Sequence, residues 1–180
     1  MRARVMLIVA VIVTVAWGCD EGAPPPTSAA LRDTADQVLY GVTYLITIEG
    51  IKRIRLFSDT VYFYQPTQIA DLVGVRVEFF SALGALSSTV TAEEGRYEWR
   101  TGSMEARSNV VATTPDDRRL TTEILRYDRT QERISGPSAF VFDSPDRHLE
   151  GDGFTADPDF RQVEALRPRQ GRITERPERR

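Results

Sequence analysis

The sequence predicts an all-β protein, elongated and antiparallel, built from repeated pairs of strands. Between residues 36 and 160, short apolar and aromatic runs alternate with polar residues. Gly, Pro, Asp or Asn interrupts them roughly every eight to twelve positions, the spacing of short strands joined by turns. Helical spacing of apolar residues is scarce. The best helix candidate is residues 31–39, where Asp33 could cap a short turn.

Two segments have the composition expected of strands. Residues 42–48 are rich in β-branched side chains, which favour an extended backbone. Residues 75–79 alternate strictly, so that Val75, Val77 and Phe79 share one face. Both segments therefore bury one face against a core.

An internal repeat of eight residues is the strongest observation: apolar, any, small, any, any, apolar or Gly, any, aromatic or small. Its copies are Leu56-Ser58-Val61-Phe63, Val90-Ala92-Gly95-Tyr97, Leu120-Thr122-Leu125-Tyr127 and Leu149-Gly151-Phe154-Ala156, at offsets of 34, 30 and 29 residues. Turn residues and a return strand follow, as at residues 104–111 and 133–142. The two-residue gap inside the pattern breaks strict alternation, which predicts a bulge that bends each outgoing strand.

A lone hairpin cannot bury its apolar face, so the repeated strand pairs must stack and share one interior. Facing sheets pack about 10 Å apart. If the two faces are splayed on one side, the gap becomes a groove wide enough for acyl chains; if they are closed, it is an ordinary sandwich core. The side chains predicted to line this interior are Tyr44, Ile46, Leu56, Val61, Phe63, Val75, Val77, Phe79, Tyr97, Leu120, Leu125, Tyr127, Phe140 and Phe142.

The amino terminus resembles a bacterial lipoprotein signal. Two arginines precede 13 apolar residues at 5–17, and a helix of that length covers only about 20 Å of the roughly 30 Å hydrocarbon core. Residues 1–18 are therefore predicted to be a signal peptide, and 19–35 an anchor Cys with a flexible linker. The single Cys, Cys19, is the predicted site of acylation and membrane attachment; a chance Cys or an uncleaved anchor is the alternative. Asp20 resembles an inner-membrane retention signal.

The folded domain is predicted to span residues 36–166, and residues 167–180 a disordered Arg-rich tail. The tail has six Arg against two Glu, two Pro and no apolar periodicity. It serves either as a basic arm for anionic headgroups or an acidic partner, or as a solubilising segment. The net charge of the whole chain, -3, argues against nucleic-acid binding.

Neither metal nor catalytic chemistry is predicted. One His and one Cys exclude a Cys/His zinc cluster and an internal disulfide, so we expect no cofactor and no metal. His148 lies in a turn-like stretch, and no Ser has the G-x-S-x-G setting of a nucleophile. The nearby acids lack an EF-hand pattern and are interpreted as turn formers: Glu150, Asp152, Asp157 and Asp159. The chain is therefore not predicted to be an enzyme.

Residues 91–111, TAEEGRYEWRTGSMEARSNVV, resemble the A-x-x-G-x-Y-x-x-x-T-G-x-x-E-A-x-G-N-V repeat of the lipopolysaccharide-export superfamily of LptA, LptC and OstA-like proteins. Ser108 stands where that repeat has Gly. Residues 151–158 are similar to the closing segment of the LptC family. The resemblance covers roughly residues 36–160, and the amino-terminal anchor favours LptC over its soluble relative LptA.

This resemblance implies a β-jellyroll, or half-pipe, and a non-enzymatic role at the periplasmic face of the inner membrane. Lipopolysaccharide would leave an inner-membrane ABC transporter, enter the jellyroll and pass to an LptA-like bridge protein. We expect residues 41–48 to face the membrane side, and a terminal strand edge near residues 149–154 to bind the bridge protein. The alternative is a structural β-repeat lipoprotein that forms a closed scaffold for envelope assembly without transferring lipid.

Overall fold

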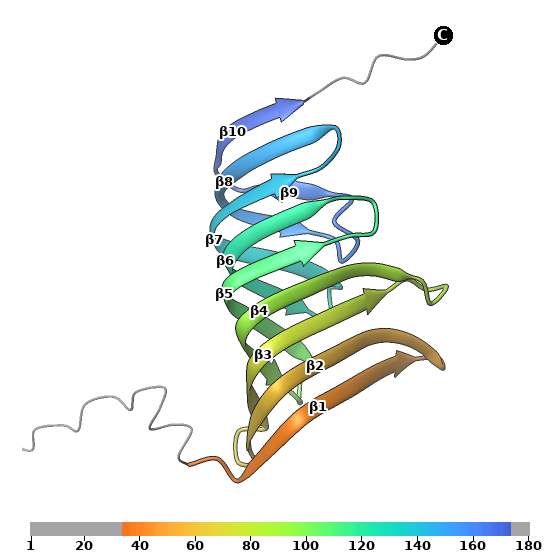
Figure 1. The fold of residues 1–180 in the computed structure, drawn as a ribbon, viewed down its shortest axis with the longest axis vertical. Helices are drawn as coiled ribbons and strands as arrows, with labels where there is room; N and C mark the ends of the chain where they lie inside the picture. The colour runs from red at the N-terminus through yellow and green to blue at the C-terminus, as the bar shows by residue number, and fades with distance from the viewer. Residues whose placement is uncertain (1–33, 174–180) are drawn as a thin grey trace, which may run out of the picture.

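A computed structural model describes residues 34–173 as ten strands joined by turns (Figure 1). The strands are β1 (Gln37–Ile48), β2 (Ile51–Tyr64), β3 (Ile69–Phe80), β4 (Leu86–Glu98), β5 (Ser103–Thr113), β6 (Arg119–Asp128), β7 (Arg133–Asp143), β8 (Arg147–Ala156), β9 (Val163–Ala165) and β10 (Pro168–Ile173). The prediction of an all-β fold is confirmed. Within the described residues, no helix is long and apolar enough to cross a membrane.

All ten strands belong to one antiparallel sheet. Consecutive strands from β1 to β8 are neighbours, β10 follows β8, and the short β9 also pairs with β8. Figure 1 shows the strands stacked along the long axis, with β1 at one end and β10 at the other. The helix candidate at residues 31–39 is wrong where the structure describes it, because β1 already begins at Gln37.

The sheet folds over on itself, and each long strand contributes to both halves. Aromatic side chains of β3 and β6, which are not neighbours in the sheet, touch across the interior. We name the two halves wall A and wall B. Wall A contains residues 42–46, 54–58, 75–79, 88–92, 110–112, 120–122, 140–142 and 149–151; wall B contains residues 37–39, 61–64, 70–72, 95–98, 104–106, 125–127, 134–136 and 154–156.

The repeat found in the sequence marks the inner face of both walls. In β6, Leu120 and Thr122 are buried in wall A, and Leu125 and Tyr127 in wall B. The two residues skipped between them are where the strand crosses from one wall to the other. Of the twelve equivalent positions in β2, β4 and β8, nine are also buried, and Phe63, Ala92 and Leu149 are half-buried.

The predicted bulges exist, but they lie mainly in the return strands. The register shifts between Arg107 and Val110 in β5 and between Gly136 and Ala139 in β7. Ser108 and Asn109 of β5 have φ angles of 61° and 53°, and the skipped segment of β7 includes Pro137, which has no N–H for the ladder. The outgoing strand β2 bends without any register shift against β3.

The carboxy-terminal segment was predicted to be disordered from Arg167 onward, and for residues 168–173 this is wrong. Pro168–Ile173 forms β10 and pairs with β8 from Arg147 to Gly151. The backbone N–H of Asp152 donates to the carbonyl of Arg167 at 2.9 Å, and Arg169 pairs with the carboxylate of Asp152 at 2.6 Å. Backbone hydrogen bonds at an exposed edge need no apolar periodicity, so the sequence carries no such signal for this strand.

Candidate functional site

The interior between the two walls is the candidate site, and it contains the residues that the sequence predicted to face inward. Twelve of them are buried members of one apolar cluster: Ile46, Leu56, Val61, Val75, Val77, Phe79, Tyr97, Leu120, Leu125, Tyr127, Phe140 and Phe142. Tyr44 and Phe63 are half-buried and pack against the same cluster. The cluster runs from β1 to β9, so the inner apolar face is continuous along the length of the sheet.

This inner face carries no charge. Among the described residues, the buried polar side chains are Ser58, Ser88 and Thr122. Each hydroxyl donates to a backbone carbonyl: Ser58 to Val73 at 2.8 Å, Ser88 to Pro158 at 2.6 Å and Thr122 to Ala139 at 2.9 Å. Since hydrogen-bonded hydroxyls cost little to bury, the face stays apolar without stranded polar groups.

Aromatic rings connect the two walls. The ring of Tyr44 on β1 lies 5.8 Å from that of Tyr97 and 4.8 Å from that of Trp99, measured between centroids. Burial raises the pKa of Tyr97 to about 12, with Tyr44 adding to the rise, and burial also raises the pKa of Tyr127. Both hydroxyls therefore remain neutral at physiological pH. Sequence reasoning missed Trp99, although its position two residues after Tyr97 puts it on the same face.

The interior is filled in this structure. The space enclosed by the central side chains, among them Leu72, Val90 and Leu125, amounts to about 20 Å³, which is room for about one water molecule and far too little for an acyl chain. An acyl chain enters such an interior only if side chains move apart. The sequence left open whether the two faces are splayed into a groove or closed into a core, and this structure has the closed core.

The free ends of the two walls meet along a line that we call the seam, defined by the pairs Phe79–Tyr127, Arg53–Glu132, Ser88–Pro158 and Arg118–Asp159. Arg53 on β2 lies 3.8 Å from the carboxylate of Glu132, and the Arg118 guanidinium donates to the carbonyl of Asp159 at 3.4 Å. A pocket of about 310 Å³ opens beside these groups, with Ile54, Phe79 and Tyr127 in its lining. The seam is thus held by few polar contacts.

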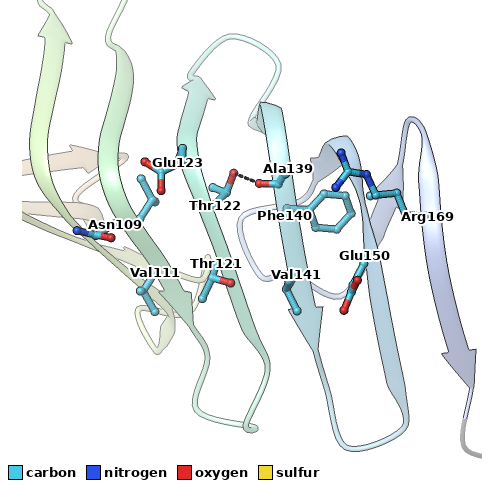
Figure 2. A pocket seen from close by; sticks show the side chains of 12 residues that line it. Asn109, Val111, Thr121, Thr122, Glu123, Ala139, Phe140, Val141, Glu150 and Arg169 are labelled. Carbon is cyan, nitrogen blue, oxygen red and sulfur yellow. Dashed lines mark hydrogen bonds between the residues drawn. The ribbon is translucent and has the colours of Figure 1, made fainter.

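A second depression, of about 400 Å³, lies over β5 to β8 (Figure 2). Val111, Thr121, Val141 and Glu150 are paired in turn across these strands, and Arg169 of β10 lies at the far side. Apolar, hydroxyl and carboxylate side chains are mixed here without a base aimed at a nucleophile. This surface shows no catalytic arrangement.

The acidic residues near the carboxyl end of the chain form hydrogen bonds and ion pairs with other residues of the fold. The Asp157 carboxylate accepts the backbone N–H of Gln162 at 2.7 Å, and Asp152 pairs with Arg169. His148 lies 2.6 Å from Asp143 and 3.0 Å from Glu150, and hydrogen bonds to these two carboxylates raise its pKa. Within residues 34–173, no group of three or more His, Cys, Asp or Glu side chains is placed to hold a metal ion.

The sheet has an edge strand at each end. β1 forms one edge and exposes several apolar side chains: Val38, Leu39, Tyr40 and Leu45. The strand expected at the other edge, residues 149–154, is instead covered by β10 and β9. β10 is the edge strand there. The predicted anchor, Cys19, lies outside the described residues.

Comparisons with known proteins agree with this architecture. A family model described as lipopolysaccharide-assembly, LptC-related, matches residues 4–173. The crystal structure of LptH from Pseudomonas aeruginosa, described as the LptA-homologous periplasmic component of the conserved lipopolysaccharide transport device, superimposes with a TM-score of 0.53. It shares 15% sequence identity over 69% of this chain and 95% of that chain, which establishes a common fold. The comparison with curated proteins found no match.

Proposed function

This chain belongs to the LptC-related lipopolysaccharide-assembly family, and from that premise we propose that it is a membrane-anchored periplasmic relay. It accepts lipopolysaccharide from an inner-membrane ABC transporter and passes it to an LptA-like bridge protein. We propose no enzymatic activity for it. Cys19 is the proposed lipid anchor, which places the protein at the periplasmic face of the inner membrane.

The observation that supports this proposal most directly is the continuous uncharged inner face from β1 to β9. Acyl chains exposed to water cost about 25 cal/mol per Å² of apolar surface. An apolar interior that parts to admit them removes most of that cost. The inner face offers contacts along the whole stack of strands, as a relay between two ends requires.

Strand pairing at the two free edges would connect the relay to its neighbours. Because the proposed anchor, Cys19, precedes the start of β1 at Gln37 by 18 residues, we propose that the β1 edge, including residues 41–48, faces the transporter and the anchored side. The β10 edge at the opposite end (Figure 1) then receives a strand of the bridge protein. Edge-to-edge pairing supplies backbone hydrogen bonds without requiring particular side chains.

A closed scaffold without lipid transfer is the second candidate, and the filled interior favours it. The two functions predict different neighbours for inward side chains. A photoreactive amino acid at Phe79 on the inner face should form an adduct with lipopolysaccharide in living cells. The matched control is Phe57 on the outer face of β2, whose ring contacts the guanidinium groups of Arg55 and Arg76. Adducts from neither position would favour the scaffold.

The anchor is tested separately. Wild-type protein should incorporate a labelled fatty acid, and Cys19→Ser should not. A wild-type protein without incorporated label would overturn lipid attachment while leaving the relay function to be judged by crosslinking.

A further inference from the structure

The turn between β8 and β9, residues 157–162, places an aromatic ring in the interior. Phe160 is 2% exposed although it lies in an irregular segment, and it belongs to the same apolar cluster as the strand residues. Other large buried side chains, such as Phe142 on β7 and Phe154 on β8, come from strands. Phe160 is thus a core side chain that no strand holds.

Local hydrogen bonds shape this turn. The N–H of Phe160 donates to the carbonyl of Asp157 at 3.0 Å, and the carboxylate of Asp157 accepts the N–H of Gln162 at 2.7 Å. Phe160 has a φ angle of 51°, in the left-handed region that a bulky residue occupies only under constraint. The turn therefore holds the ring inward at a cost in backbone strain.

The same turn crosses the seam. It leaves wall B at the end of β8, and two of its carbonyls accept hydrogen bonds, one from wall A and one from the turn that precedes β6. Ser88 of β4, which is 0% exposed, donates to Pro158 at 2.6 Å, and Arg118 donates to Asp159 at 3.4 Å. Breaking these two bonds frees the turn and leaves every hydrogen bond between strands intact.

We propose that residues 157–162 are a displaceable plug, and that the ring of Phe160 occupies space which an acyl chain of the carried lipid takes when it enters. This inference rests on the proposed relay function. The filled interior has no room for an acyl chain, so its entry requires the walls to spread or an apolar group to leave, and Phe160 is a group that can leave without breaking a strand pairing. Removing a strand residue would break the ladder, whereas moving Phe160 exchanges one apolar occupant for another at the cost of two hydrogen bonds.

Thiol accessibility tests the movement directly. In the full chain with Cys19→Ser, Phe160→Cys provides the single thiol, and Phe142→Cys, on strand β7, provides the matched control. Maleimide should label Cys at 160 slowly without lipid and several-fold faster after addition of purified lipopolysaccharide. The control position should stay protected in both conditions. Equal labelling of position 160 with and without lipopolysaccharide would overturn the plug.

The rate of lipopolysaccharide binding provides a second test of the plug. Phe160→Ala should accelerate binding of lipopolysaccharide several-fold, whereas Phe142→Ala, which removes the same ring from a strand, should not. If Phe160→Ala does not fold, Phe160→Leu should show a smaller acceleration in the same direction. Unchanged or slower uptake in the folded variant contradicts the plug. Lipid adducts at Phe79 combined with an immobile position 160 would reject the plug and retain the relay, and the absence of any lipid binding would reject the relay itself.

Discussion

The ring of Phe79 on β3 meets the ring of Tyr127 on β6 edge-on, with 5.1 Å between the centroids. The two strands are separated by β4 and β5 in the sheet, so this contact spans the interior from wall A to wall B. Edge-to-face pairs of this kind contribute about 0.5–1.5 kcal/mol beyond the area they bury. Phe79 and Tyr127 therefore form one of the points at which the two walls are held together.

A charge at this contact should abolish lipid binding. Tyr127→Glu removes the buried ring and places a carboxylate on the apolar inner face, and should lower the free energy of unfolding by about 3 kcal/mol. Tyr127→Phe keeps the ring and should stay within about 1 kcal/mol of the wild type with normal binding. Urea unfolding and co-purification of lipopolysaccharide measure both effects. A folded Tyr127→Glu protein with unchanged lipid binding would contradict the role of the interior.

Ser108 is a site where a substitution should stabilise the protein. Its φ angle of 61° lies in the left-handed region, which costs a residue with a Cβ atom about 1 kcal/mol relative to Gly. Ser108→Gly should therefore raise the free energy of unfolding by up to about 1 kcal/mol. Ser135→Gly, at a position without a left-handed φ angle in β7, is the control and should lower it by about 0.5–1 kcal/mol. Thermal unfolding of both variants tests this prediction. Destabilisation by Ser108→Gly would show that contacts of the Ser108 side chain contribute more to stability than relief of its backbone strain.

His148 should make the stability of the β7–β8 pair dependent on pH. Hydrogen bonds to Asp143 and then Glu150 raise its pKa in the folded protein above the ordinary value of 6.5. Folding thus favours the protonated ring. Its contribution to the free energy of unfolding is fully present below pH 6.5 and is lost as the pH rises through the raised pKa. The melting temperature should fall across that interval in the wild type and much less in His148→Gln. A ring titration by NMR at or below pH 6.5 would contradict this expectation.

Removal of β10 should prevent transfer to a bridge protein. Deleting residues 168–180 removes the strand that forms the outer edge beyond β8, whereas deleting residues 174–180 leaves that strand in place. Lipopolysaccharide transfer to a purified LptA-like protein should be lost in the first variant and kept in the second, with membrane attachment unchanged in both. Loss of transfer in the shorter deletion would assign partner binding to the basic tail instead.

The inner face could be predicted from the sequence because each inward position requires an apolar or small side chain, and this requirement repeats with each strand pair. Leu120 and Tyr127 were identified in this way. β10 and Phe160 could not be, for different physical reasons. β10 is held by backbone groups that carry no side-chain signal, and Phe160 gains its burial from contacts with strands far away in sequence. The bulges at Ser108–Asn109 were placed in the wrong strand of the pair, since a register shift depends on both partners.

Because every long strand contributes to wall A and to wall B, the two walls are not independent sheets. Unfolding one wall would disrupt the hydrogen bonds between strands in the other. Moving the walls apart, in contrast, bends each strand only where it crosses from one wall to the other. The fold consequently resists the unfolding of either wall alone, but it allows the two walls to move apart.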